Sequence, residues 1–150
     1  MSNEEQPHKL NLEDGKRALV DHARERGAEI FAKYGPDYTP EVLAQILKDD
    51  TCVRFPVELG FDRKHIEPGL FAICEPVNEE KPSDGYSLLL HEHFQNDATA
   101  IAPLLFYHLV RINYGEFATH SDAEAFGAAA MGMEEEAYYQ RVVELVDGIV

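Results

Sequence analysis

The chain has 150 residues, of which 45% are apolar and 27% charged, and this composition predicts one ordinary globular domain rather than a disordered protein. Its 28 acidic residues outnumber its 13 basic residues, which gives a formal net charge of −15 at pH 7. Binding to nucleic acid or to an anionic membrane surface needs clustered Lys and Arg, so we expect neither kind of partner.

The sequence carries no sign of a membrane span or of export. Its longest apolar stretch, residues 98–110, is interrupted by polar residues and a proline and is too short to cross a bilayer. The N-terminus is polar and has no apolar run of the signal-peptide type. Cys52 and Cys74 do not form a CxxC motif, so we expect two buried thiols in a reducing compartment. These features predict a cytoplasmic protein.

The N-terminal third predicts a tail followed by two helices. We expect residues 1–10 to form a flexible tail and residues 11–150 to form a single domain. Residues 14–34 have apolar side chains at helical spacing, which predicts an amphipathic helix ended by a Gly-Pro pair. A second helix over 40–48 follows Thr39, a favourable N-cap, and has proline at its first position.

The pattern then changes to that of strands, which we expect at about 52–60, 69–77 and 85–94. In the first segment apolar and polar residues alternate, and Pro56 favours an edge position because it has no amide to donate. In the third segment three successive leucines, residues 88–90, are apolar on both faces, which predicts a central strand.

Three further helices are predicted after the strands, over 98–114, 123–131 and 134–147. Ser121 and Glu124 have the spacing of a capping box at the start of the second of these helices. That helix is rich in alanine, so it can approach a neighbouring helix closely. Separate runs of strands and helices predict an α+β fold, with a three-stranded, mostly antiparallel sheet covered by N-terminal and C-terminal helices.

The best candidate for a chemical site is the His-x-His sequence at the end of the third strand. In a strand, His91 and His93 would point to the same face and could bind one metal ion. Asp97 and His108 are the candidates for further ligands, with Cys52, Cys74 and His120 as alternatives. The cofactor would be zinc or another divalent transition metal, and the alternative is a pair of solvated or hydrogen-bonded histidines.

A second motif surrounds His108. A strand followed by a helix with His108 and Gly115 resembles the HExxHxxG helix of zincin-type metallopeptidases. Leu109 replaces the glutamate of that motif and Ile112 replaces its second histidine. The resemblance therefore implies an inactive relative that lacks both the zinc pair and the base. Without it, His108 is a core or half-buried histidine with one hydrogen-bond partner.

The sequence contains no complete set of catalytic groups, phosphate loop or nucleophile elbow. It therefore predicts a non-catalytic binding or assembly domain, acting as a homodimer or with a protein partner. The alternative is a small metal-dependent, hydrolase-like enzyme that uses His91 and His93 with Asp97, His108 or a cysteine.

Overall fold

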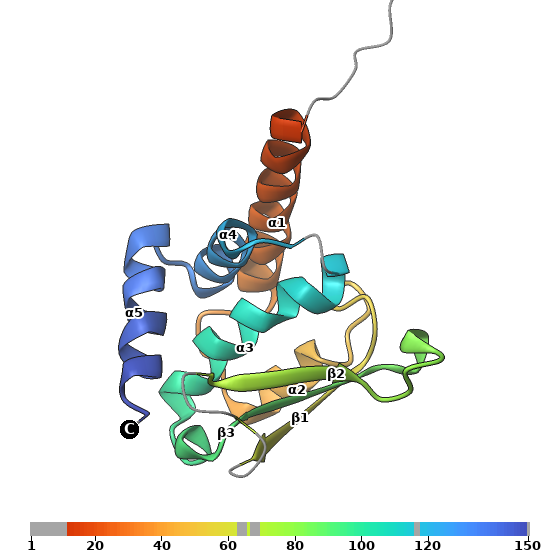
Figure 1. The fold of residues 1–150 in the computed structure, drawn as a ribbon. Helices are drawn as coiled ribbons and strands as arrows, with labels where there is room; N and C mark the ends of the chain where they lie inside the picture. Colours follow the sequence, from red (N-terminus) through yellow and green to blue (C-terminus); the bar gives the residue numbers. More distant parts are fainter. Residues whose placement is uncertain (1–11, 63–65, 67–69, 116–117, 150) are drawn as a thin grey trace, which may run out of the picture.

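The computed structural model describes residues 12–62, 66, 70–115 and 118–149, so the predicted tail over residues 1–10 lies outside the described part. The α+β fold class is confirmed: five α-helices accompany a three-stranded sheet in this part of the chain (Figure 1). The helices are α1 (Leu12–Tyr34), α2 (Pro40–Ile46), α3 (Ala98–Tyr114), α4 (His120–Met131) and α5 (Glu135–Asp147). The strands are β1 (Val57–Asp62), β2 (Ala72–Pro76) and β3 (Tyr86–His91).

The sheet has the strand order β1-β3-β2, so β3 is the central strand, as its run of leucines predicted. β3 is antiparallel to β2, where Ala72 lies opposite Leu90, and parallel to β1, where Val57 lies opposite Tyr86. The sheet is therefore mixed, whereas the sequence predicted mostly antiparallel pairing. When successive strands reverse direction and the third inserts between the first two, the third must run parallel to the first.

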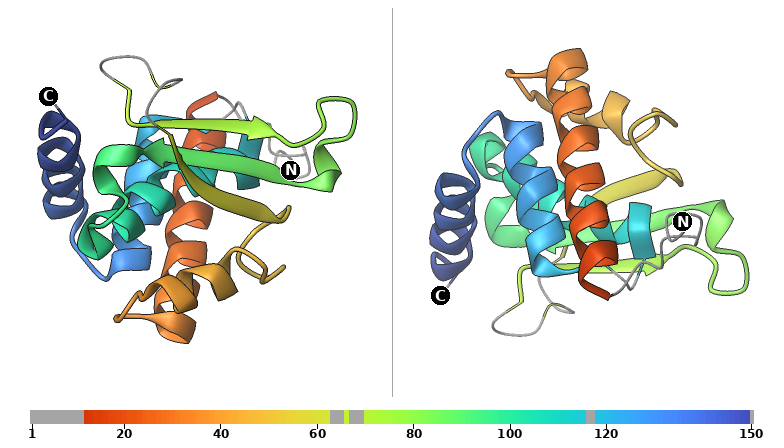
Figure 2. Two further views of the ribbon diagram at one scale, coloured as in Figure 1. Left: turned by 90° about the horizontal axis from the view of Figure 1, so that it is seen from below. Right: turned by 90° about the horizontal axis from the view of Figure 1, so that it is seen from above.

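The elements form layers in which α3 separates the sheet from the other long helices. Figure 1 shows α3 directly above the strands, with α1 and α4 side by side beyond it and α5 along one edge. In the left view of Figure 2, which is seen from below, the strands lie in front of these helices. The helices therefore cover one face of the sheet. α2 lies beside β1, where the amide of Val57 donates to the carbonyl of Leu47 at 3.3 Å.

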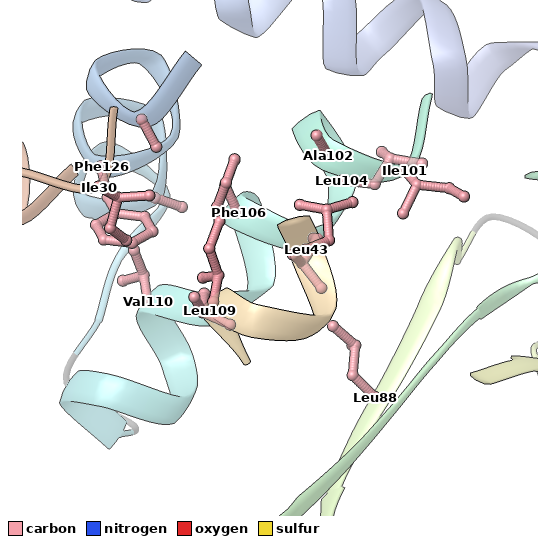
Figure 3. Close-up of a cluster of buried hydrophobic side chains, with 14 of the residues drawn as sticks. Ile30, Leu43, Leu88, Ile101, Ala102, Leu104, Phe106, Leu109, Val110 and Phe126 are labelled. Atoms are coloured by element: carbon pink, nitrogen blue, oxygen red, sulfur yellow. The ribbon is translucent and has the colours of Figure 1, made fainter. Parts of the chain in front are cut away.

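A continuous apolar core joins these layers. Figure 3 shows Leu88 pointing from the central strand towards Leu43 of α2, with Phe106 of α3 beside them. Phe126 of α4 and Ile30 of α1 close the core on the far side of α3. Every layer therefore contributes buried side chains to one cluster.

Glycines allow the helices beyond α3 to pack closely, which agrees with the expectation from the alanine-rich sequence of α4. A Cβ atom at Gly27 of α1 would lie 2.3 Å from the carbonyl oxygen of Phe126 in α4. A Cβ atom at Gly127 would lie 2.1 Å from the hydroxyl of Tyr138, which donates a 2.7 Å hydrogen bond to the carbonyl of Pro103 in α3. α4 is therefore held against α1 on one side and α5 on the other.

The bounds of the first two strands differ from the prediction. The first strand starts at Val57 and not at residue 52, because the amides of Cys52 and Val53 both donate to the carbonyl of Asp49 and close a turn. The predicted second strand, 69–77, is confirmed for Ala72–Pro76.

The capping box of α4 also lies elsewhere than the sequence predicted. Thr119, not Ser121, is the N-cap: its side chain accepts from the amide of Asp122 at 3.2 Å. The carboxylate of Asp122 accepts from the amide of Thr119 at 2.8 Å, which completes the box. A carboxylate three residues after Thr or Ser occurs twice in this segment, and the earlier pair forms the box.

The contact at Gly27 predicts opposite effects for the same substitution at two positions of α1. Gly27→Ala should lower the free energy of unfolding by about 1–3 kcal/mol, because the new methyl group forces α1 and α4 apart. Gly15→Ala should raise it by about 0.5–1 kcal/mol, because a Cβ atom at Gly15 meets nothing within 4 Å and alanine favours the helix.

Urea unfolding followed by far-ultraviolet circular dichroism measures both effects. Equal effects of the two substitutions would contradict the packing of α1 on α4.

Candidate ligand-binding site

The structure changes the geometry expected of the His-x-His sequence. β3 ends at His91, and residues Glu92–Phe94 form a 3₁₀ helix instead of continuing the strand predicted to residue 94. The turn forms because Nδ1 of His91 accepts a 3.0 Å hydrogen bond from the amide of His93. In a strand, side chains alternate between the two faces, and this alternation would place both imidazoles on one face. It does not apply to this pair, because His93 lies in the 3₁₀ helix. Their ring centroids lie 6.4 Å apart with planes at 65°.

The two further metal candidates occupy different environments. Asp97 is the residue before α3, and its carboxylate accepts a 2.7 Å hydrogen bond from the hydroxyl of Thr99. His108 lies in α3, where its ring packs edge-to-face on Phe71 at 5.0 Å. Over the described ranges, no three or more His, Cys, Asp and Glu side chains form a group that could hold a metal ion.

Metal binding by His91, His93, Asp97 and His108 stays a prediction of the sequence. Its test is the metal content of the protein purified without an affinity tag, compared with His91→Ala and His93→Ala. The prediction requires near-stoichiometric zinc, iron or manganese that both substitutions remove. Absence of metal, with unchanged stability in both variants, would contradict it.

The two cysteines are free thiols, Cys52 buried and Cys74 half-buried. Burial raises the pKa of each thiol to about 11. Both groups are therefore protonated at neutral pH, and neither is an activated nucleophile.

A hollow lies where the start of β2, the second half of α3 and the first turn of α4 meet. It has a volume of about 490 Å³, within the range of roughly 300–1,000 Å³ that is typical of small-molecule sites. Its apolar wall is formed by Leu70, Phe71, Ala72, Val110, Ala118 and Ala123. Its polar groups belong to Tyr107, His108, Arg111, Thr119 and His120. We call this hollow the α3–α4 pocket.

His108 is a neutral polar group on the wall of the α3–α4 pocket. It is half-buried, and burial together with the charge of Arg111 lowers the pKa of His108 to about 4. Neither ring nitrogen has a hydrogen-bond partner among the described residues, although every fully buried side-chain nitrogen and oxygen there has one. The ring nitrogens of His108 are therefore open to solvent, and the single partner expected from the sequence is absent from this part of the chain.

A hydrogen-bonded pair of polar side chains joins the two helices that border the pocket. The hydroxyl of Tyr107 in α3 and Nδ1 of His120 in α4 lie 2.6 Å apart. Burial raises the pKa of Tyr107, so its phenol is protonated at neutral pH and can donate to Nδ1. The hydrogen bond fixes both rings at the edge of the pocket. Nε2, the other ring nitrogen of His120, takes no part in this bond.

Arg111 supplies the positive charge of the pocket. It follows His108 by three residues and Tyr107 by four, so all three lie on one face of α3. The guanidinium is exposed, and within the described ranges no carboxylate lies within ion-pair distance of it. A cation that pairs with no carboxylate of the described residues thus lies beside an apolar hollow.

Sequence reasoning found part of this site. The sequence predicts His108 as a metal ligand and His120 as an alternative ligand. It singles out neither Tyr107 nor Arg111. The available signal was the set of polar residues at positions 107, 108 and 111, which interrupts the apolar sequence of α3. The Tyr107–His120 pair depends on how the chain turns between α3 and α4, which no spacing rule predicts.

A smaller hollow of about 180 Å³ lies between α1 and the end of α3. Asn113 bridges its wall: its side chain accepts from the amide of Arg54 at 2.9 Å and donates to the carbonyl of Cys52 at 3.1 Å. Because these groups already satisfy one another, we regard the α3–α4 pocket as the candidate site.

Comparison of the chain with family models, with curated proteins and with solved structures gives no match in any of the three. No helix in the described part of the chain is both long enough and apolar enough to cross a membrane. The function must therefore be argued from the pocket itself.

The lowered pKa of His108 predicts a pH dependence of stability. Between pH 6.5 and pH 4 the unfolded chain binds a proton at this position that the folded chain does not, so stability falls as the pH falls. Between pH 7.5 and pH 5.5 the loss due to His108 should be about 1 kcal/mol. Measurement at pH 5.5 stays above the isoelectric point of about 4.7, where the protein would precipitate.

Urea unfolding at the two pH values tests this expectation. His108→Gln should remove about 1 kcal/mol of the pH dependence. Val110→Ala is the control on the same wall: it should lower stability at both pH values and keep the wild-type difference between them. An unchanged pH dependence in His108→Gln would show that the imidazole titrates alike in the folded and unfolded chains.

Proposed function

We propose that this protein is a non-catalytic binding domain and that its ligand is a small, largely apolar molecule held in the α3–α4 pocket. The observation that carries the proposal is the combination of a 490 Å³ hollow, a mainly apolar wall and a few polar groups from α3 and the start of α4. Sites that bind small molecules commonly have this composition: apolar area provides affinity and a few polar groups fix orientation.

The polar groups of the pocket favour binding over catalysis. Nucleophilic catalysis needs a hydroxyl or thiol activated by a neighbouring base. Thr119 has an aliphatic hydroxyl on the described wall. Its oxygen accepts a hydrogen bond from the amide of Asp122 as the N-cap of α4. The Tyr107 hydroxyl is paired with His120, and its raised pKa makes the phenolate scarce at neutral pH.

The position of the pocket supports a preformed site. Its walls are the buried helix α3, the capped first turn of α4 and the edge strand β2, which the core holds in place. Leu70, 51% exposed, stands at its rim and extends the apolar surface outwards. A ligand would enter a site that already has its shape, so little binding energy would be lost in ordering the protein.

Assembly as a homodimer or with a protein partner remains a prediction of the sequence. The exposed large apolar residues of the described structure, Leu70, Val77 and Tyr139, come from three different parts of the chain. Sedimentation equilibrium measures the mass in solution, and a monomer at all concentrations would contradict the homodimer.

The proposal predicts that a neutral apolar fluorophore, N-phenyl-1-naphthylamine, binds the folded protein at one site. The chain has no Trp, so the emission of the bound probe is free of that background. Ala118→Leu and Ala123→Leu add bulk to the wall and should weaken probe binding by about tenfold or more, because each removes space that the probe occupies. Ala44→Leu, at an exposed position of α2, should bind the probe like the wild type.

Thermal unfolding of each variant verifies that the fold is intact, with the half-buried Ala118 as the milder site of the two. Equal probe affinity in the wild type and in both filled variants would contradict binding in the α3–α4 pocket.

A further inference from the structure

We infer that the ligand of the α3–α4 pocket is a small monocarboxylate with an apolar tail, whose carboxylate is bound by Arg111 and the neutral imidazole of His108. The inference rests on the proposed function and adds the chemical class of the ligand.

The first support is the state of Arg111. Some cations of the described chain pair with carboxylates, as Arg24 does with Asp21 and Glu135. Arg111 has no such partner in the described ranges, although it lines the pocket. A guanidinium presents two parallel N–H groups that match the two oxygens of a carboxylate. An anionic ligand would supply the partner that the described residues do not provide.

The second support is His108, one helical turn before Arg111 on the same wall. Its ring nitrogens have no partner in the described residues and are open to solvent. A neutral imidazole has one N–H, which can donate a hydrogen bond to a carboxylate oxygen beside the guanidinium. Together, the two side chains offer a cation and a neutral donor about one turn of helix apart.

The charges around the pocket determine which end takes the carboxylate. Glu124 lies one turn after His120 on α4; burial raises the pKa of its carboxyl, and the charge of His120 opposes that rise. A ligand carboxylate beside His120 would therefore approach a second acidic group. At Arg111 it meets a positive charge instead, so the head group is assigned to the Arg111 end of the wall.

The remaining wall describes the tail of the ligand. Phe71, Ala72, Val110 and Ala123 provide hydrocarbon and aromatic surface but no charge. The edge-to-face contacts of Phe71 with Tyr107 and His108 hold the aromatic part of this wall in place. A short alkyl or aryl chain would replace water on this surface, which is the favourable exchange for apolar area.

Octanoate and 1-octanol test the inference, because they share a tail and differ in the head group. Each is titrated into the protein directly, and the dissociation constant is taken from amide chemical shifts in two-dimensional NMR spectra. Octanoate should bind wild type about tenfold or more tightly than octanol, because a hydrogen bond to a charged group adds that much affinity. Arg111→Met keeps a long side chain without the charge, and should bring the ratio of the two constants close to one.

Two further variants complete the design. Arg111→Lys keeps the charge without the planar fork and should retain part of the preference for octanoate. Lys48→Met removes a positive charge at an exposed position away from the pocket, and should keep the wild-type ratio.

The outcomes separate the two proposals. Equal affinity of the wild type for octanoate and octanol, with shifts at pocket residues, would overturn the carboxylate assignment and leave the binding function standing. Loss of both ligands alike in Arg111→Met would also overturn it, since Arg111 would then only support the wall. Failure of octanoate, octanol and the neutral fluorophore to bind would overturn both proposals.

Discussion

The burial of α3 is the constraint on which the rest of the structure depends. Ten of its 17 residues are buried, and they lie all around the helix rather than on one stripe. A helix of this kind is stable in water only when other elements cover it on several sides. The sheet covers one side, α4 with α1 the opposite side, and α5 an edge. The close contacts at Gly27 and Gly127 follow from this demand, because they let the covering helices approach each other.

The α3–α4 pocket arises where that cover is incomplete. Towards its C-terminal end α3 presents Tyr107 and His108, both half-buried, and Arg111, which is exposed. The same helix is fully covered one turn earlier, at Leu104, Leu105 and Phe106. The polar residues of α3 therefore sit on its least covered face, and the apolar residues that flank them remain in contact with the hollow. One helix thus provides both the centre of the core and one wall of the pocket, which makes that wall rigid.

The sequence predicted the elements better than their arrangement. The bounds of α3 and the start of α2 at Thr39 follow from apolar spacing and from a residue whose side chain caps its own helix, which are local properties. The run of leucines indicated that β3 is central, but the parallel pairing of β1 with β3 depends on the direction in which each strand runs, which local alternation does not give. The end of β3 was missed because an imidazole at residue 91 can bond to the amide two residues on, an interaction invisible to a pattern of apolar residues. The pocket was found only in part, because its walls are distant in sequence.

A protein with a net charge of −15 repels an anionic ligand, but the strength of that repulsion depends on the distance to each charge. At physiological ionic strength the interaction between exposed charges is screened over about 8 Å, so carboxylates on distant surfaces act weakly on a bound ligand. A guanidinium in contact with the ligand acts at hydrogen-bond distance, and beside an apolar wall it is screened less than in open water. The surrounding negative field then lowers the association rate of an anion, while the contact with Arg111 lowers its dissociation rate. Because His108 is neutral, it can donate a hydrogen bond but has no charge that would attract acidic groups of the protein. The position beside Arg111 therefore remains open for the ligand.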